Sequence, residues 1–141
     1  MEVSDKLFVY GTLLSEIDNP YTHFLRRHGQ YGGKGYFFGK LYDIGHYPGA
    51  LHDPACNEKV FGDIILLKNK EEVLKMLDAY EGVGEDYLQP HEYIRKVLVV
   101  FREKRPLHCW TYLYNYPVHH LKKISSGNYL QYLKDIHHSQ P

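Results

Sequence analysis

Hydrophobic residues recur along the chain in two spacings, one typical of strands and the other typical of helices. Continuous or alternating apolar runs predict strands at residues 7–10, 36–44, 60–67, 93–101 and 107–115. Short helices are predicted at residues 20–28, 69–80 and 128–135. Because the strands do not alternate regularly with the helices, the pattern disfavours a doubly wound sheet. We expect an α+β fold, namely a small, mostly antiparallel β-barrel with a few short helices.

Signals at the helix ends support two of these helices. Asn19 followed by Pro20 predicts a start, with Asn as the cap and Pro in the first helical position. Asn69 and Glu72, three residues apart, predict a variant of the capping box at the second start. Gly82 then ends that helix. The face of the second helix that we expect to pack on the core carries Val73, Met76, Leu77 and Tyr80.

The remaining stretches are rich in glycine, proline or charge, and we expect them to connect the elements. Residues 30–35 predict a glycine-rich turn, and residues 45–50 predict a bend or strand break. The other expected connections are a polar loop at 51–58, a polar segment at 83–92 and a charged hairpin turn at 102–106. The length of 141 residues indicates one domain, residues 1–136, followed by a flexible C-terminal tail, residues 137–141.

Composition narrows the classes of partner. The 17 Lys and Arg residues balance 17 Asp and Glu residues, which argues against nucleic-acid binding through a basic surface. No apolar run approaches the roughly 18 residues of a membrane span, and the N-terminus does not resemble a signal peptide. Cys56 and Cys109 form no paired motif, so we expect a reducing, cytoplasmic location. The ten histidines show no zinc-like spacing, so we expect no metal site.

The first predicted strand leads into a turn with the chemistry of an anion site. It ends at Gly11, which has no Cβ and can adopt backbone angles closed to other residues. The turn continues through Thr12 and Leu13, and consecutive N–H groups in such a turn can form a concave nest for an oxygen anion. The alternative, from these residues alone, is an ordinary first strand that ends in a glycine turn.

Glu81 occupies a position that local electrostatics disfavours. It lies in the last turn of the second predicted helix, beside Gly82, where the helix dipole carries partial negative charge. This field is expected to raise the carboxyl pKa, which suits a group that takes up and returns a proton near neutral pH. The alternative is a solvated glutamate paired with Lys70 or Lys75.

Several motifs, in order along the chain, resemble those of the gamma-glutamylcyclotransferase-like proteins, also called the AIG2-like family. Residues 7–13, Leu-Phe-Val-Tyr-Gly-Thr-Leu, resemble the opening signature of that family. Residues 77–82, Leu-Asp-Ala-Tyr-Glu-Gly, resemble its second signature, a helix that ends in the catalytic glutamate. Further segments similar to the family are residues 47–50, 93–97, 112–114 and 126–129. The resemblance covers nearly the whole chain.

The resemblance implies a barrel with a cavity at one mouth, closed by the first turn and the helix that carries Glu81. Family members of known activity release 5-oxoproline from a γ-glutamyl amide or peptide without a cofactor. By resemblance, Glu81 is the general acid and base. The substrate-binding residues that the resemblance implies are Tyr10, Gly11, Thr12, Leu13, Tyr93 and Tyr114.

Three positions stay open at this point. Either Tyr87 or Tyr93 fills the role of a pocket tyrosine, and Tyr93 is favoured because Arg95 follows it at the family's offset. Tyr114 faces either the cavity or the core. Arg95 itself is either a substrate contact or a charge on the strand surface.

The same cavity admits two classes of function. The first is a cyclotransferase that acts on a γ-glutamyl small molecule, including one that removes a γ-glutamyl tag in a biosynthetic pathway. The second is a non-catalytic small-molecule binding module. In the first case the loops at residues 45–58 and 83–92 are expected to choose the leaving amine. We expect a monomer or a weak homodimer.

Overall fold

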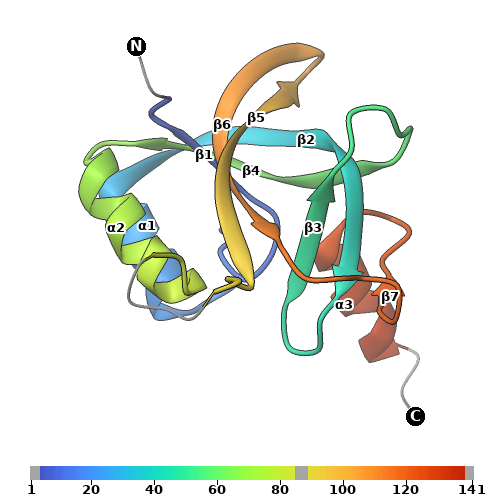
Figure 1. Ribbon diagram of the computed structural model, residues 1–141. Coiled ribbons are helices and arrows are strands. Elements are labelled where there is room, and N and C mark those ends of the chain that lie inside the picture. Colours follow the sequence, from blue (N-terminus) through green and yellow to red (C-terminus); the bar gives the residue numbers. More distant parts are fainter. Residues whose placement is uncertain (1–3, 85–88, 139–141) are drawn as a thin grey trace.

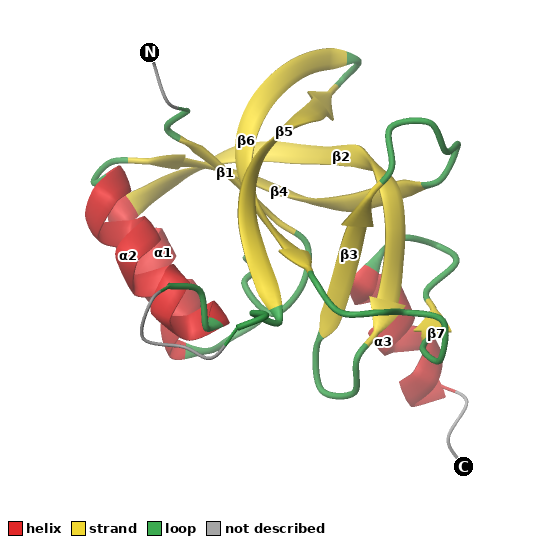
Figure 2. Cartoon of the chain, viewed as in Figure 1, coloured by secondary structure: helices red, strands yellow, loops and turns green. Residues whose placement is uncertain are grey.

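The computed structural model describes residues 4–84 and 89–138, which form seven strands and three helices (Figure 1). The strands are β1 (Lys6–Val9), β2 (Gly29–Asp43), β3 (Pro48–His52), β4 (Lys59–Leu67), β5 (Tyr93–Arg102), β6 (Arg105–Tyr114) and β7 (Lys122–Lys123). The helices are α1 (Pro20–His28), α2 (Lys70–Glu81) and α3 (Tyr129–His138). Figure 2 shows the strands at the centre, with α1 and α2 on one side and α3 on the other.

Five of the strands close into a barrel. Hydrogen bonding follows the order β2-β4-β1-β6-β5, and the pairing of Tyr36 on β2 with Phe101 on β5 returns to the first strand. The pairs are antiparallel except for β1 and β6, which run parallel where Leu7 faces Trp110. β3 and β7 extend β2 outside the barrel. The expected α+β fold, a small and mostly antiparallel β-barrel with short helices, is confirmed.

β1 lies between β4 and β6, and its sequence suits that central place. Leu7, Phe8 and Val9 are at most 3% exposed, since neighbouring strands flank both edges and core side chains cover them. The ring of Phe8 packs edge-on against Phe37 of β2, with 5.6 Å between the ring centroids. The prediction of a buried strand from this apolar run is confirmed.

β2 is longer than the sequence indicated, because residues 30–35 belong to it and do not form the predicted turn. Its pairing with β4 shifts register between Tyr31 and Lys34, which marks a bulge. Gly33, inside the bulge, has a φ of 102°, a conformation that residues with a Cβ rarely adopt. The glycines therefore bend the strand instead of ending it.

Other boundaries differ where strand pairing, not local sequence, decides them. β3 begins at Pro48, inside the predicted strand break, and includes two residues of the predicted 51–58 loop, because it pairs with residues 39–43 of β2. α3 continues to His138, two residues into the segment expected as a flexible tail, and residues 139–141 lie outside the described part of the chain. β7 was not predicted.

Both predicted helix starts are present, but only one is capped by its asparagine. Asn19 Oδ1 accepts hydrogen bonds from the backbone N–H groups of Tyr21 and Thr22, both at 2.9 Å. Asn69 precedes α2 without a side-chain cap bond, so the predicted capping box does not form. Gly82 ends α2 in the left-handed conformation, as predicted.

The buried face of α2 is rotated from the predicted one. Its buried residues are Val73, Leu74 and Leu77. Met76 and Tyr80, which were expected to pack on the core, are 43% and 37% exposed. The rotation leaves the end of α2, with Tyr80 and Glu81, beside a cavity instead of inside the core. No helix in the described ranges is long and apolar enough to cross a membrane.

Candidate active site

A cavity of about 340 Å³ lies where the chain leaves β1 and where α2 ends. Its lining comprises residues 8–13 together with Tyr47, Pro48, Tyr80, Glu81, Glu92, Tyr93 and Tyr112. Most of the residues proposed from the sequence therefore meet here, although they come from distant parts of the chain. The exception is Tyr114, which does not line the cavity. Tyr87, the alternative to Tyr93, lies outside the described residues.

The turn after β1 forms one wall of the cavity. The N–H of Leu14 donates to the carbonyl of Gly11 at 3.0 Å, so Thr12 and Leu13 are the central residues of a β-turn. Asn19 Nδ2 donates to the carbonyl of Thr12 at 2.7 Å and ties the turn to the start of α1. The backbone N–H groups of Thr12 and Leu13 donate to no described residue, and both residues line the cavity.

Gly11 is needed in this turn for space. It is not among the described residues with positive φ, so the turn does not use the wider backbone freedom of glycine. A Cβ at this position would lie 2.6 Å from Cγ of Pro48, far inside van der Waals contact. Pro48 lines the same cavity, and the missing side chain therefore lets β3 approach the turn.

A buried aspartate holds the turn from behind. Asp63 on β4 is fully buried, and its Oδ2 accepts from the backbone N–H and the hydroxyl of Ser15, at 3.0 and 2.9 Å. Lys34 Nζ, on the bulged part of β2, lies 2.9 Å from the other carboxylate oxygen. The bulge and the turn are thus joined through one compensated buried charge.

Glu81 is the last residue of α2 and is half-buried in the cavity wall. No salt bridge within the described ranges includes it, and the expected alternative of a pair with Lys75 is not formed. Burial raises its pKa from 4.5 to about 7, with the nearby charge of Glu92 as the second cause. Glu81 therefore exists in both protonation states near neutral pH.

Glu92, a second cavity carboxylate, was not proposed from the sequence. Its Oε2 accepts a hydrogen bond from the hydroxyl of Tyr47 at 2.5 Å, and its carbonyl accepts from the N–H of Asn115 at 2.7 Å. The sequence places Tyr47 in a predicted bend and in a segment similar to the family, without a side-chain role. The local signal for Glu92 is that it directly precedes Tyr93 in the sequence. Its hydrogen bond with Tyr47 forms only in the folded protein.

Two buried phenols fix the floor of the cavity. The hydroxyl of Tyr10 donates to the carbonyl of Tyr112 at 2.6 Å and accepts from the N–H of Ala50 at 3.2 Å. The hydroxyl of Tyr93 donates to the carbonyl of Pro48 at 2.7 Å. Burial raises the pKa of both phenols well above their usual range, and the charge of Glu81 adds to the effect. Both side chains therefore stay neutral and oriented.

Arg95, which the sequence left open as a substrate contact or a charge on the strand surface, forms an ion pair between β5 and α2. Its guanidinium binds both carboxylate oxygens of Asp78 on α2, at 2.8 and 3.1 Å, and lies over the ring of Trp110. Tyr112 donates to the same carboxylate at 2.7 Å. Arg95 does not line the cavity. This ion pair joins α2 to the barrel one helical turn before Glu81.

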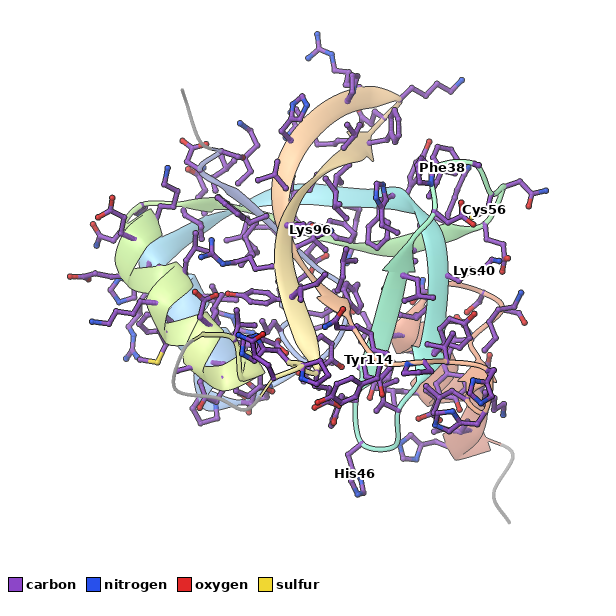
Figure 3. All side chains as sticks on the ribbon, in the orientation of Figure 1. Phe38, Lys40, His46, Cys56, Lys96 and Tyr114 are labelled. Carbon is purple, nitrogen blue, oxygen red and sulfur yellow. The ribbon has the colours of Figure 1, made fainter. Side chains whose placement is uncertain are left out.

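Tyr114 supports the site from outside. Figure 3 shows it at the end of β6, beside the β2–β3 hairpin. Its side chain packs on Gly49, where an added Cβ would meet it at 2.8 Å, and its ring contacts Tyr93 edge-on at 5.6 Å. Tyr114 is therefore a packing residue behind the cavity wall, which settles the open alternative in favour of the core.

The described lining carries two carboxylates and no Lys, Arg or His side chain. No group of three or more His, Cys, Asp and Glu residues suited to a metal ion occurs in the part of the chain that the structure describes. The arrangement places an acid with a raised pKa in the same cavity wall as the turn after β1.

Comparison with known proteins agrees with this arrangement. The family described as "Gamma-glutamyl cyclotransferase, AIG2-like" matches residues 7–131. The chain belongs to this family. The matched range includes every residue of the cavity lining, from the β1 turn through Glu81 to Tyr112.

Two bacterial relatives in the gamma-glutamylcyclotransferase family align over most of the chain. The family protein YtfP of Citrobacter rodentium is 33% identical over an alignment of 129 residues, and the match covers 89% of this chain and 95% of the relative. YtfP of Escherichia coli K12 is 32% identical over 126 residues, 89% of this chain and 96% of the relative. Both carry the family name without a stated substrate.

Solved structures share the fold. The solution structure of E. coli YtfP is 30% identical, with a TM-score of 0.64, covering 90% of this chain and 97% of that one. The crystal structure of a mouse AIG2-like protein is 26% identical, with a TM-score of 0.61, covering 81% of this chain and 80% of that one. YkqA of Bacillus subtilis has a TM-score of 0.72 at 20% identity, and this chain spans only 44% of its length. That last similarity concerns the fold alone.

Proposed function

We propose that this protein is a cyclotransferase that releases 5-oxoproline from a γ-glutamyl amine or γ-glutamyl peptide, with Glu81 as the general acid and base. One observation carries the proposal: half-buried Glu81 lies in the same cavity wall as a turn whose Thr12 and Leu13 amides donate to no described residue. Burial, which raises the pKa of Glu81 to about 7, supports it. Membership of the family supports the same reaction. The reaction needs no cofactor.

The reaction is intramolecular, so positioning supplies much of the rate. The substrate's α-ammonium passes a proton to the Glu81 carboxylate, and the neutral α-amine attacks the γ-carbonyl carbon. The new carbon–nitrogen bond closes a five-membered ring, and the bond to the departing nitrogen breaks. Two protons leave the α-nitrogen and two reach the departing nitrogen, so Glu81 ends as it began. The products are 5-oxoproline and an ammonium.

The pKa of Glu81 suits both halves of this transfer. A carboxyl group whose pKa is raised to about 7 can both accept and release a proton near neutral pH. An ordinary glutamate, with a pKa of 4.5, would be a poorer proton acceptor. The N–H groups of Thr12 and Leu13, which donate to no described residue, are the proposed donors to the oxygen that gains negative charge, or to the substrate's carboxylate.

A turnover assay tests the proposal. The protein is incubated with a panel of γ-glutamyl amines and γ-glutamyl dipeptides, and 5-oxoproline is measured. We expect turnover of at least one substrate, and a loss of roughly 1,000-fold or more in kcat for Glu81→Gln, because the amide cannot take up a proton. Glu72→Gln, an exposed change on the same helix, is the matched control and should retain full activity.

The alternative, a non-catalytic binding module, predicts a different result. Substrates would bind to the wild-type protein, for instance by calorimetry, but none would release 5-oxoproline. Equal turnover by the wild-type protein and Glu81→Gln would refute the assigned role of Glu81 while leaving the reaction itself in place.

A further inference from the structure

Tyr80 joins the end of α2 to the turn after β1. Its hydroxyl lies 3.0 Å from the hydroxyl of Thr12, and both residues line the cavity. Unlike the buried hydroxyls of Tyr10 and Tyr93, this pair lies at the exposed edge of the cavity. Because Thr12 belongs to the turn and Glu81 directly follows Tyr80, the pair links the two parts of the cavity wall on which the proposed reaction depends.

The ring of Tyr80 is oriented by α1. It packs against the ring of Tyr21, with 3.9 Å between the ring centroids and 36° between the ring planes. Figure 2 shows α1 and α2 on the same side of the barrel, which brings these rings together. Tyr80 is 37% exposed, so this contact directs its side chain and core packing does not. A ring that is already restrained loses less freedom when its hydroxyl forms a hydrogen bond.

Thr12 is thereby held at two points. Asn19 Nδ2 donates to its carbonyl at 2.7 Å, and the hydroxyl of Tyr80 pairs with its side chain. Its backbone N–H, like that of Leu13, donates to no described residue. The two contacts therefore restrain the residue whose N–H we propose as a donor to the substrate, and neither contact uses that N–H.

We propose that Tyr80 is a positioning residue that acts through Thr12 and sets the distance and angle between the turn amides and the carboxylate of Glu81. The inference rests on the proposed function, because it assigns a task within that reaction. The substrate must reach both groups at once, since its α-ammonium passes a proton to Glu81 while one of its oxygens accepts from the turn. A direct bond between the helix end and the turn fixes their separation before the substrate binds.

Removal of single hydroxyl groups tests this role. Tyr80→Phe keeps the ring that packs on Tyr21, and Thr12→Val keeps the shape of the side chain and the backbone N–H. We expect kcat/KM for 5-oxoproline release to fall roughly tenfold in each variant, because a small misplacement of the turn slows the reaction. The double variant should lose about the same factor as either single variant, since all three lack one shared interaction. Thr12→Ser keeps the hydroxyl and should stay within about twofold of the wild-type protein.

Tyr31→Phe is the matched control. It removes the hydroxyl of a tyrosine on β2 that is 52% exposed and does not line the cavity, so kcat/KM should not change. A bond that serves stability alone would leave kcat/KM of folded Tyr80→Phe at the wild-type value, and circular dichroism at the assay temperature shows that each variant is folded. An unchanged kcat/KM in Tyr80→Phe, or additive losses in the double variant, would overturn the inference and leave the cyclotransferase proposal in place.

The pH profile of kcat separates this role from an effect on the neighbouring acid. Its acid limb reports the protonation of Glu81 in the proposed reaction. Burial and the charge of Glu92 are the causes of the raised pKa of Glu81, and the hydroxyl of Tyr80 is not among them. Tyr80→Phe should therefore lower the rate and keep the midpoint of the acid limb. A shifted midpoint would show that Tyr80 acts on Glu81 and not through the turn.

A titration with 5-oxoproline separates this inference from the reaction. The compound is the proposed product, so the NMR shifts of the backbone amides give its Kd without turnover. It should shift the Thr12 and Leu13 amides of the wild-type protein, with a Kd roughly tenfold higher in Tyr80→Phe and unchanged in Tyr31→Phe. If no γ-glutamyl substrate reacts, the proposed function fails, and this titration alone decides the role of Tyr80. An unshifted Thr12 amide in the wild-type protein, or an equal Kd in Tyr80→Phe, would overturn the inference.

Discussion

Two acidic residues on α2, Asp78 and Glu81, lie one helical turn apart and have opposite surroundings. Asp78 faces β5 and β6, where Arg95 binds both of its oxygens and Tyr112 adds a third hydrogen bond. Glu81 faces the cavity, and no salt bridge among the described residues includes it. Residues three apart share one side of a helix, so the helix itself does not explain the contrast.

The comparison teaches how the fold separates an acid held in an ion pair from the acid that we propose as the catalyst. The barrel supplies a cation to the acid that joins α2 to β5. The described lining of the cavity has no Lys, Arg or His side chain beside Glu81. Burial is therefore the main influence on the pKa of Glu81, which rises to about 7. The ion pair of Asp78 with Arg95 also holds Glu81 in position, because it fixes the last turn of α2 against β5.

Shortening the reactive acid should give the largest effect. In Glu81→Asp the carboxylate withdraws by one methylene from the cavity wall, and we expect kcat to fall roughly 100-fold, about 3 kcal/mol, because proton transfer depends steeply on position. Steady-state release of 5-oxoproline measures it. Unimpaired turnover would show that the position of the carboxylate matters little.

Breaking the structural pair should affect stability next. Asp78→Asn leaves the largely buried Arg95 without a counter-charge, and we expect the free energy of unfolding to fall by about 2–3 kcal/mol. Urea unfolding of Asp78→Asn, Arg95→Met and the double variant measures the coupling between the two side chains. Additive losses in the double variant would contradict the assigned ion pair.

The pH dependence of stability should show the raised pKa directly. The pKa of Glu81 in the folded protein lies above its ordinary 4.5, so the protonated form favours the native state. This stabilisation is complete below pH 4.5 and is lost as the pH rises through 7, a change of about 2 kcal/mol after allowance for partial exposure.

Urea unfolding at pH 5 and pH 8 tests this prediction against Glu81→Gln, which cannot titrate. The wild-type protein should lose about 2 kcal/mol more than the variant between the two values. An identical pH response in both proteins would contradict the raised pKa.

Filling the space at Gly11 should have the smallest effect of the four. In Gly11→Ala the new methyl group meets the Pro48 ring at 2.6 Å, and we expect a loss of about 1 kcal/mol in stability and a raised KM as the turn shifts. The double variant Gly11→Ala with Pro48→Ala removes the clash and should recover part of the KM. If the KM does not recover in the double variant, the effect of Gly11→Ala does not come from the clash with Pro48.

Local sequence was sufficient for several parts of the fold. The apolar run of β1, the Asn19 cap and the Gly82 stop depend on neighbours within a few residues, and each is present as predicted. Glu81 was found in the same way, because its conflict with the helix dipole is visible from its position beside Gly82. Such features can be read without knowing what packs against them.

The features that the sequence predicted wrongly, left open or missed depend on residues that are distant in the sequence. Residues 30–35 continue as strand because β4 pairs with them, and Arg95 leaves the cavity because Asp78 binds it. Tyr114 belongs to the packing behind Tyr93 because Gly49 lets it approach. Glu92 joins the site through Tyr47, which is 45 residues away. None of these partners can be inferred from spacing within one element.

By itself, the sequence determined the family, the barrel class of fold, and the pairing of the β1 turn with Glu81 as the centre of interest, because short-range patterns and ordered motifs carry that information. Only the tertiary structure decided which tyrosines line the cavity, which acids have counter-charges, and that Glu92 lies beside Glu81. The physical reason is that burial and charge compensation are properties of a three-dimensional neighbourhood, and barrel closure between β2 and β5 creates that neighbourhood.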